Sequence, residues 1–252
     1  MKKLLLILLC LPMIGFGQLT YVPDDNFEQA LINLGYDNVL DDSVITSSID
    51  TIMILFVFGQ NISSLIGIED FVSLKTLRCS GNQLTNLDLS NNISLIRLFC
   101  GGNQITNLNL NNNSSLIVLR CGSNPLNSLD VSDNISLSQL FCRNSMLTDL
   151  NIKNGNNIAL DSLFITNNPN LSCIEVNNIN YINNNFTVTN GNIDSQHYFS
   201  ADCSGATSIK EHTTNKELLK VTDLLGRETK QTNQPLFYIY DDGTVEKRIV
   251  IE

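Results

Sequence analysis

Four cysteines stand at intervals of 21 residues in the middle of the chain, at Cys79, Cys100, Cys121 and Cys142. A fixed period of this length is typical of stacked repeats, in which every repeat places the same residue at the same position. No other feature constrains the fold as much, because each repeat must follow the same backbone path beside the same neighbours. The period predicts a solenoid and directs the search for function from pockets to repeated surfaces.

Residues 74–155, aligned on these cysteines, share the pattern L-x-x-L-x-C-x-x-N-x-L-x-x-L-x-L-x-x-N. The apolar residues alternate with outward ones within each L-x-L or L-x-C unit, which is the periodicity of a β-strand. One repeat cannot bury its apolar side chains alone, so neighbouring repeats must stack. The inward positions of the first repeat are Leu74, Leu77, Cys79, Leu84, Leu87 and Leu89.

Asparagines recur at the end of each half of the repeat. A buried asparagine amide at a turn bonds backbone groups that the turn leaves unpaired. Ser145 takes the asparagine position in the fourth repeat, so this rung of the ladder is expected to be weaker. The two predicted ladders are Asn82, Asn103 and Asn124 in the first half and Asn92, Asn113 and Asn134 in the second.

The spacing, the leucines and the asparagines together resemble the leucine-rich repeat family. The resemblance is specific over residues 74–155 and looser over 52–74 and 160–176, where Val57 and Ile165 take the cysteine position. It implies a mainly β fold, a leucine-rich-repeat solenoid of 21-residue repeats. We expect about six turns with parallel strands in both halves of the repeat, because so short a repeat leaves no room for a helix.

The chain begins with a predicted secretory signal peptide over residues 1–17. It has a basic start, an apolar run over 4–11 and small residues ahead of Gln18. The apolar run is too short to span a bilayer. Cys10 would leave with this segment. We therefore expect export, and with it a compartment in which disulfides persist.

Residues 18–51 are predicted to form an N-terminal cap with a helix over 23–35. Asp25 and Glu28 fit a capping box, and Gly35 fits the end of the helix. Such a helix would cover the first edge of the solenoid, where strand groups are otherwise unpaired. Its expected apolar stripe is Phe27, Leu31 and Leu34.

The seven cysteines fall into groups with different expected roles. Cys173 and Cys203 are predicted to form a disulfide that closes a C-terminal cap, worth about 3–4 kcal/mol in the chain-entropy treatment. The alternative is a pair of buried free thiols. The four repeated cysteines are interpreted as small buried apolar residues. Occasional disulfides between neighbouring turns are the alternative, whereas a straight row does not make a tetrahedral metal cage.

The last part of the chain changes character after a polar linker. It is rich in β-forming residues, with a hairpin expected to turn at 241–243. Segments 220–223, 225–228 and 243–252 resemble the C-terminal sorting domain of the type IX secretion system of Bacteroidetes bacteria. The resemblance implies export across both membranes with removal of the tail; the alternative is a small structural β-domain. The expected sorting-signal residues are Gly226, Arg227, Gly243 and Lys247.

The predicted domain order follows from these segments. It is signal peptide 1–17, N-terminal cap 18–51, leucine-rich-repeat solenoid 52–176, C-terminal cap 177–203, linker 204–215 and C-terminal secretion or sorting domain 216–252.

The sequence carries no recognisable catalytic machinery. It has two histidines, His197 and His212, both in polar segments, and none of the common nucleophile, metalloprotease, phosphate-binding or dinucleotide-binding motifs. The net charge of −10 disfavours nucleic acid as a partner. We therefore expect a protein that is not an enzyme and that needs no cofactor and no metal, although calcium at Asp/Asn turns remains an open alternative.

One outward column stands beside the cysteines. The residue before each cysteine position reads Phe56, Arg78, Phe99, Arg120, Phe141 and Phe164, and nearby outward positions add Ile54, Phe58, Arg97, Val118 and Arg143. The other half of the repeat places Asp88, Asn109, Asp130 and Asn151 in the equivalent column. One face is thus expected to be basic and aromatic, and the other acidic and polar.

The aromatic and basic face has two interpretations. Cation–π contacts between neighbouring turns would stabilise the sheet without any ligand. Alternatively, exposed aromatic and arginine side chains mark a binding face, and a row of rings also suits sugar stacking. The candidate binding residues are Phe56, Phe58, Arg78, Arg97, Phe99, Arg120, Phe141, Arg143 and Phe164.

The sequence therefore predicts a secreted or cell-surface protein that binds an unknown extracellular protein or glycan through its strand face. The expected export partner is the type IX secretion machinery, and no stable membrane span is expected. The alternative is a structural component of the surface or matrix without a specific ligand.

Overall fold

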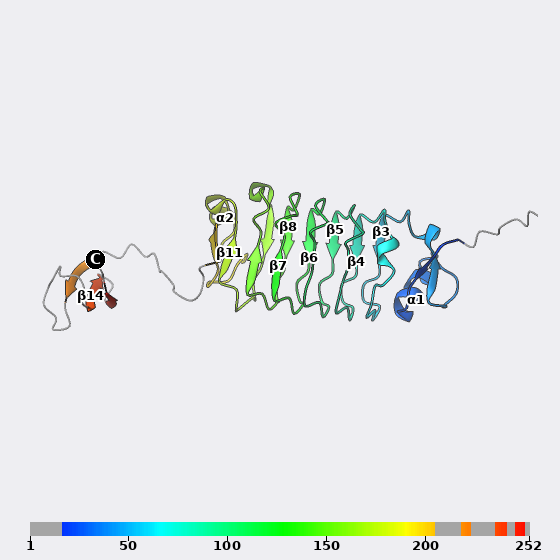
Figure 1. Ribbon diagram of the computed structural model, residues 1–252, viewed down its shortest axis with the longest axis horizontal. Coiled ribbons are helices and arrows are strands. Elements are labelled where there is room, and N and C mark those ends of the chain that lie inside the picture. Colours follow the sequence, from blue (N-terminus) through cyan, green and yellow to red (C-terminus); the bar gives the residue numbers. More distant parts are fainter. Residues whose placement is uncertain (1–16, 205–217, 223–234, 241–244, 250–252) are drawn as a thin grey trace, which may run out of the picture. The chain divides into compact units, whose positions relative to one another are not determined.

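The computed structural model describes residues 17–204, 218–222, 235–240 and 245–249. Residues 17–204 belong to one compact unit, and the strands after residue 217 belong to a second. The first unit is a solenoid of about seven turns with 21-residue spacing, one more turn than the sequence suggested (Figure 1). The solenoid predicted from the cysteine period, and the leucine-rich-repeat architecture that the family resemblance implies, are confirmed.

The first half of each repeat contributes one strand to a six-stranded parallel sheet. Neighbouring turns pair residue for residue, so that Leu77 lies beside Leu98 and Leu98 beside Leu119. The strands of this sheet follow one another in chain order. They are β3 (Ile54–Phe56), β4 (Thr76–Arg78), β5 (Arg97–Phe99), β6 (Val118–Arg120), β8 (Gln139–Phe141) and β10 (Ser162–Phe164). The strands numbered between them, β7 (Ser128–Asp130) and β9 (Asp149–Asn151), belong to the sheet formed by the second half of the repeat.

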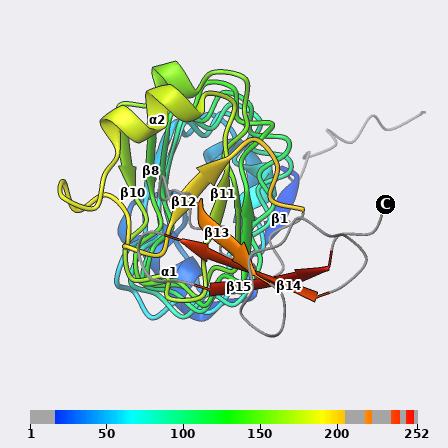
Figure 2. The same cartoon turned by 90° about the vertical axis from the view of Figure 1, so that its left-hand side faces the viewer.

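The second half of the repeat forms a shorter parallel sheet across the core. Viewed along the solenoid, β8 and β10 lie on one side, with β11 and β12 across from them (Figure 2). Residues 87–89 and 108–110 are not strands, so the expectation of strands in both halves is wrong for the first turns. The strands of this sheet are β7 (Ser128–Asp130), β9 (Asp149–Asn151), β11 (Cys173–Glu175) and β12 (Tyr198–Ser200).

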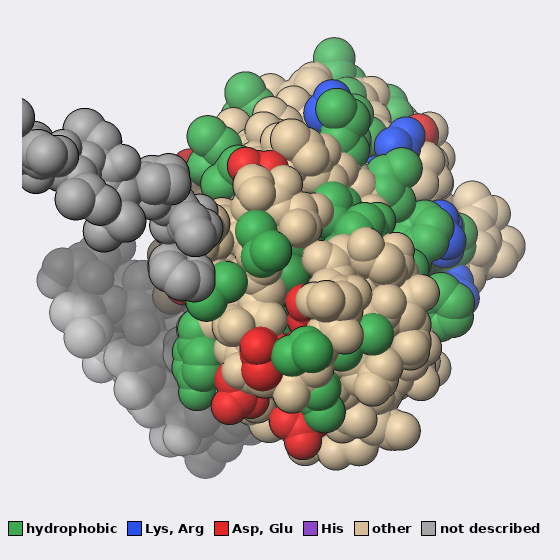
Figure 3. Space-filling model, turned by 90° about the vertical axis from the view of Figure 1, so that its right-hand side faces the viewer, with side chains coloured by type: hydrophobic (Ala, Val, Ile, Leu, Met, Phe, Trp, Pro, Cys, Tyr) green, Lys and Arg blue, Asp and Glu red, His purple; other side chains and the backbone are tan. Residues whose placement is uncertain are grey.

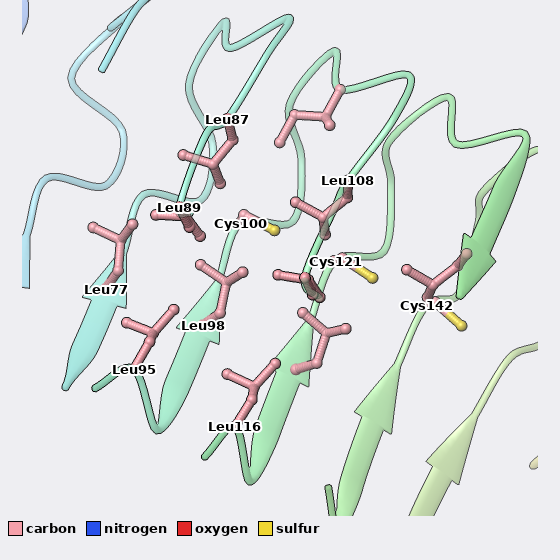
Figure 4. Close-up of a cluster of buried hydrophobic side chains, with 14 of the residues drawn as sticks. Leu77, Leu87, Leu89, Leu95, Leu98, Cys100, Leu108, Leu116, Cys121 and Cys142 are labelled. Carbon is pink, nitrogen blue, oxygen red and sulfur yellow. The ribbon is translucent and has the colours of Figure 1, made fainter. Parts of the chain in front are cut away.

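Leucines from both halves of the repeat and the cysteines of the first half fill the interior of the solenoid (Figure 4). Each fully buried leucine contributes about 1.5–3 kcal/mol. The four repeated cysteines are completely buried and are not bonded to one another. Burial raises the pKa of the Cys79 and Cys121 thiols to about 12, so they stay protonated and unreactive. The cysteine ladder is therefore a packing element, and the alternative of disulfides between neighbouring turns is wrong.

The asparagine ladder of the first half bonds adjacent turns together. The Nδ2 of Asn103 donates to the carbonyls of Cys79 (3.0 Å) and Cys100 (2.9 Å), while its Oδ1 accepts from Leu84 N (3.1 Å). Asn124 repeats the pattern one turn later. The Oγ of Ser145 is buried without a hydrogen-bond partner, as expected of a weakened rung.

The second ladder is less completely bonded. The amide of Asn113 donates to the carbonyls of Leu89 and Asn92, and Asn134 donates in the same way one turn on. The Oδ1 atoms of Asn92, Asn113 and Asn134 have no hydrogen-bond partner. The ladder of the first half is therefore the stronger of the two.

The turn after each strand of the six-stranded sheet requires a left-handed residue. The residue two positions after each cysteine position has a φ between 54° and 68°. Glycine adopts this conformation without steric cost, whereas a side chain makes it unfavourable, least so for asparagine. The six residues are Gly59, Gly81, Gly102, Ser123, Asn144 and Asn167.

Ser123→Gly is expected to raise the free energy of unfolding by about 0.5–1 kcal/mol, because it relieves the left-handed strain at φ 56°. Ser172→Gly is the matched control, because Ser172 is exposed and its φ is not positive. The control should lower stability by about the same amount through the flexibility of glycine in the unfolded chain. Urea unfolding measures both changes, and a Ser123→Gly protein no more stable than wild type would contradict the strain.

The N-terminal cap consists of a two-stranded sheet and a helix. β1 (Leu19–Tyr21) pairs antiparallel with β2 (Ser43–Ile45), and α1 (Asp25–Asn33) lies between them in the chain. Phe27 packs on Phe71 with 6.3 Å between ring centroids, which covers the first edge of the solenoid (Figure 1). The single-turn 3₁₀ helix η1 (Thr46–Ser48) connects the cap to the first repeat, and a second one, η2 (Ile68–Asp70), lies between β3 and β4.

The expected capping box is wrong. The N-cap is Asp24, one residue earlier than expected, and its Oδ1 accepts from Phe27 N. Glu28 is instead fully buried, and its carboxylate accepts from three backbone N–H groups of residues 41–43, because a buried charged group needs hydrogen-bond partners. Leu34 is 41% exposed because it lies past the last turn of α1, and Ala30 takes its place in the buried stripe.

Asp24 also fastens the cap to the first repeat. Its Oδ2 accepts from the N and Oγ of Ser63 and from Ser64 N, at 2.6–2.9 Å. Burial disfavours the charged carboxylate, but these hydrogen bonds outweigh burial and lower the pKa of Asp24 below its ordinary value. The helix cap and the joint between cap and solenoid thus share one side chain.

The C-terminal cap is closed by the predicted disulfide. Cys173 and Cys203 are bonded, with 5.8 Å between their Cα atoms. The bond joins β11 to the segment after β12. The 3₁₀ helix η3 (Asn157–Ala159) lies between β9 and β10, and α2 (Ile179–Asn185), between β11 and β12, lies at the rim of the solenoid (Figure 2). The Asn178 side chain caps α2 by accepting from Tyr181 N.

Acid is expected to weaken the C-terminal cap through His197. Its Nδ1 accepts from Asp194 N (3.1 Å), so the ring is neutral with its proton on Nε2, beside the Asn168 carbonyl. Burial lowers the pKa of His197 below its ordinary 6.5, although the carbonyl and Asp194 oppose this. The unfolded chain therefore binds the proton at a higher pH than the folded one, and stability falls as pH drops below 6.5.

The test follows thermal unfolding from about pH 7.5 to 5.0, the range in which an unperturbed histidine becomes protonated. A His197→Gln variant should lose less stability than wild type over this range, because glutamine does not titrate. Equal acid sensitivity in the two proteins would contradict the role of His197.

The tail unit contains three antiparallel strands in chain order. They are β13 (Leu218–Thr222), β14 (Pro235–Tyr240) and β15 (Val245–Ile249). Lys247 lies in β15, opposite Phe237, whereas Gly226, Arg227 and Gly243 lie outside the described residues. So do the expected hairpin turn, most of the linker and residues 1–16 of the expected signal peptide. The sorting domain stays a prediction. Among the described residues, no helix is long and apolar enough to cross a membrane.

Candidate binding face

The outward column predicted from the sequence lies at the ends of the six parallel strands. We name Phe56, Arg78, Phe99, Arg120, Phe141 and Phe164 the Phe/Arg column. Each member is paired directly with the next across the sheet. Because strand neighbours lie about 4.8 Å apart, the column is about 24 Å long.

The arginines of the column lie between the rings. The Cζ of Arg78 is 4.9 Å from the centroid of Phe56 and 4.7 Å from that of Phe99. The Cζ of Arg120 is 5.4 Å from Phe99 and 4.4 Å from Phe141. Since Arg78 and Arg120 come from strands on either side of β5, both faces of Phe99 are covered by guanidinium groups.

The column ends in a pair of stacked rings beside the C-terminal cap. Phe141 and Phe164 stack with centroids 5.1 Å apart, and the Cζ of Arg143 is 4.4 Å from the Phe164 centroid. The Nη2 of Arg143 donates to the Gly191 carbonyl (3.0 Å). Arg143 therefore joins the column to the cap and is more constrained than Arg78 or Arg120.

The flanking positions differ in exposure. Ile54 and Phe58 are more than half exposed, and Arg97 is exposed as well. Val118 shares the outer face with Arg97 and Gln139, its neighbours across the sheet, but its side chain is buried, so it adds no exposed surface. The exposed surface is thus the column with Ile54, Phe58 and Arg97 beside it.

The electrostatics of this face are positive along its length. An aromatic ring is negative on its faces and positive at its edge, and here the faces of Phe99 are occupied by cations. The part of the ring left to solvent is the edge, and the guanidinium groups present N–H donors. Throughout the part of the chain that the structure describes, no arginine pairs with a carboxylate.

The opposite face carries the column that we name the Asp/Asn column, Asp88, Asn109, Asp130 and Asn151. Each side-chain Oδ1 accepts from the backbone N–H two residues later, at 2.8–3.1 Å. In the case of Asp88, the hydrogen bonds that Ser90 donates lower the pKa of the carboxyl group, so it is charged. The sequence analysis placed these residues but missed this bond, although the recurrence of Asp or Asn before each second-half turn was its signal.

Two hollows lie on the side of the Asp/Asn column. One, of about 250 Å³, is lined by polar residues that include Asp88, Asn107 and Asn109. The other, of about 320 Å³, is lined by Asp130, Asp149 and Glu175 with the disulfide. Within the described residues, no group of three or more histidine, cysteine or acidic side chains is placed to hold a metal ion.

Charge is distributed unevenly around the solenoid. Viewed from its N-terminal end, the visible lysine and arginine side chains gather along one edge, whereas acidic side chains lie mostly elsewhere (Figure 3). This agrees with the position of the Phe/Arg column on one sheet and of the Asp/Asn column on the other half of each repeat.

The chain is similar to solved internalin structures. The functional domain of InlJ from Listeria monocytogenes, which includes a cysteine ladder, is 30% identical, with a TM-score of 0.54 over 64% of this chain and 38% of that one. The internalin InlF from the same organism is 22% identical, with a TM-score of 0.52 over 71% of this chain and 56% of that one. This chain thus spans less than two thirds of either structure. No protein family and no curated protein matches it. The chain shares the leucine-rich-repeat solenoid fold of these internalins.

Proposed function

We propose that this protein is a secreted, non-enzymatic scaffold that binds an acidic protein partner through the Phe/Arg column. The observation that carries the proposal is that Arg78 and Arg120 are exposed and held between rings, and that no carboxylate among the described residues pairs with them. Arginines immobilised in this way lose little conformational entropy when they bind, and their planar forks match carboxylates.

The geometry favours acidic groups over neutral sugars. A sugar ring stacks on the face of an aromatic ring, but both faces of Phe99 are covered by guanidinium groups. A partner along the column meets ring edges and N–H donors, which attract carboxylate oxygens. The face of Phe56 turned away from Arg78 is the one candidate position for sugar stacking in this column.

The proposed route to the outside rests on the two ends of the sequence. The signal-peptide pattern of residues 1–17 and the sorting-domain resemblance of 216–252 support export by the type IX machinery, with the protein released or held at the cell surface. Mass spectrometry of culture medium and cell surface tests this route. We expect a mature N-terminus at Gln18 and loss of the tail; a secreted protein that retains residues 216–252 would contradict the sorting role.

Binding is tested with a fluorescent poly-L-glutamate peptide and a neutral Gly/Ser peptide of equal length. We expect saturable, salt-sensitive binding of the acidic peptide only. Arg78→Gln/Arg120→Gln should weaken it by about tenfold or more, equivalent to about 1.4 kcal/mol. Lys75→Gln/Lys153→Gln removes the same charge outside the column and should bind like wild type. Equal weakening in both variants would contradict a specific face, and stronger binding of heparin would favour an anionic glycan.

A further inference from the structure

We propose that the acidic partner of the Phe/Arg column is the Asp/Asn column of a second copy of this chain. The inference rests on the proposed function, because it uses the same arginines as receptors for carboxylates. It adds the identity of the partner and predicts that the protein assembles with itself.

The two columns have the same charge period. Arg78 and Arg120 lie two turns apart with uncharged Phe99 between them, and Asp88 and Asp130 lie two turns apart with uncharged Asn109 between them. Because a single solenoid sets both spacings, each pair of charges is separated by about 9.6 Å along the axis. When two copies lie side by side, Arg78 and Arg120 therefore face Asp88 and Asp130 of the second copy at the same time.

Both sets of charges are available for such a contact. Arg78, Arg120, Asp88 and Asp130 are exposed, and none of them belongs to an ion pair in the described parts of the chain. The carboxylates are held in place by the bonds from Ser90 N (3.0 Å) and Ser132 N (2.8 Å). Rigid charges on both sides reduce the entropy lost on docking.

The columns lie on different faces of one solenoid, so each copy carries both halves of the contact. A contact between two different patches is heterologous and does not close on itself in a pair of molecules. Docking of this kind leaves one free Phe/Arg column and one free Asp/Asn column at the two ends of the assembly. The expected product is an open stack that grows with concentration.

The net charge of the chain determines the salt concentration at which association is expected. At −10, whole molecules repel one another at low ionic strength. Near physiological salt the Debye length is about 8 Å, which screens this repulsion more than it weakens charges in direct contact. Association is therefore expected at about 0.15 M salt and should weaken toward about 1 M.

Charge reversal on one face at a time tests the proposal by sedimentation velocity. Arg78→Glu/Arg120→Glu makes both faces acidic, and Asp88→Arg/Asp130→Arg makes both basic. We expect concentration-dependent association of wild type, monomers of each variant alone, and association of the two variants when mixed. The quadruple variant, in which the two faces exchange charge, should also associate. Asp25→Arg/Asp41→Arg, in the N-terminal cap, is the matched control and should associate like wild type.

A wild type that stays monomeric at all concentrations, or a mixture of the two variants that does not associate, would overturn the proposal. Loss of folding in either double variant is detected by circular dichroism, and the association of wild type with concentration and its weakening toward about 1 M salt then decide. If wild type is monomeric but still binds poly-L-glutamate, this inference fails and the proposed function stands. If it does neither, both fail.

Discussion

Asn103→Ala is expected to lower the free energy of unfolding by about 3–5 kcal/mol, the largest effect of any single substitution considered for the ladders. The Oδ1 of Asn103 is the acceptor for the buried Leu84 N–H, which would be left without it. The carbonyls of Cys79 and Cys100 would each lose one of two amide donors, because Asn82 and Asn124 also donate to them. Urea unfolding followed by circular dichroism measures the change.

Ser145→Ala is the matched control on the same ladder. The Oγ of Ser145 is buried without a partner, so its removal should change stability little or increase it. Ser145→Asn should increase stability by restoring donors to the neighbouring carbonyls. Comparable losses for Asn103→Ala and Ser145→Ala would show that side-chain volume rather than hydrogen bonding matters at these positions.

Removal of the Cys173–Cys203 disulfide is expected to cost about 3–4 kcal/mol, since the bond closes a loop with a sequence separation of 30. Cys173→Ser/Cys203→Ser should therefore unfold at a lower urea concentration than wild type. Hydrogen exchange should rise first in the C-terminal cap, where β11 and β12 lose their covalent closure.

Reduction supplies the control for the disulfide. A reducing agent should destabilise wild type to the level of the double serine variant and leave that variant unchanged, because the four ladder cysteines are free thiols already. Further destabilisation of the variant by reductant would mean that ladder cysteines are bonded to one another in solution. An unchanged wild type would contradict a stabilising disulfide.

The repeats could be predicted from the sequence because each position is specified several times over. The columns that begin at Leu77, Cys79 and Asn82 place the same residue types at the same burial in successive turns. The caps occur once, so single residues decide them. Asp25 and Glu28 satisfied a capping pattern, but Asp24 caps the helix and Glu28 satisfies the loop at 41–43, a tertiary demand that no local pattern reveals.

The residues of the candidate face could be predicted from the sequence, but the arrangement of their side chains could not. Alternation placed Arg78, Phe99 and Arg120 outward, as observed. It did not show that guanidinium groups cover both faces of Phe99, the observation on which we base the proposal of an acidic partner rather than a neutral sugar. It also did not show that the side chain of Val118, on the same outer face, is buried. These properties depend on side-chain directions rather than on spacing.

The central claim is that the arginines of the Phe/Arg column serve binding more than folding. The most direct test measures unfolding and poly-L-glutamate binding on one preparation of Arg78→Gln/Arg120→Gln. The variant removes four exposed cation–π contacts of about 0.5 kcal/mol each. We expect it to stay folded, with a loss of stability of no more than about 2 kcal/mol, and to bind about tenfold more weakly or worse. A variant that unfolds, or that stays folded and binds as wild type does, would contradict the claim.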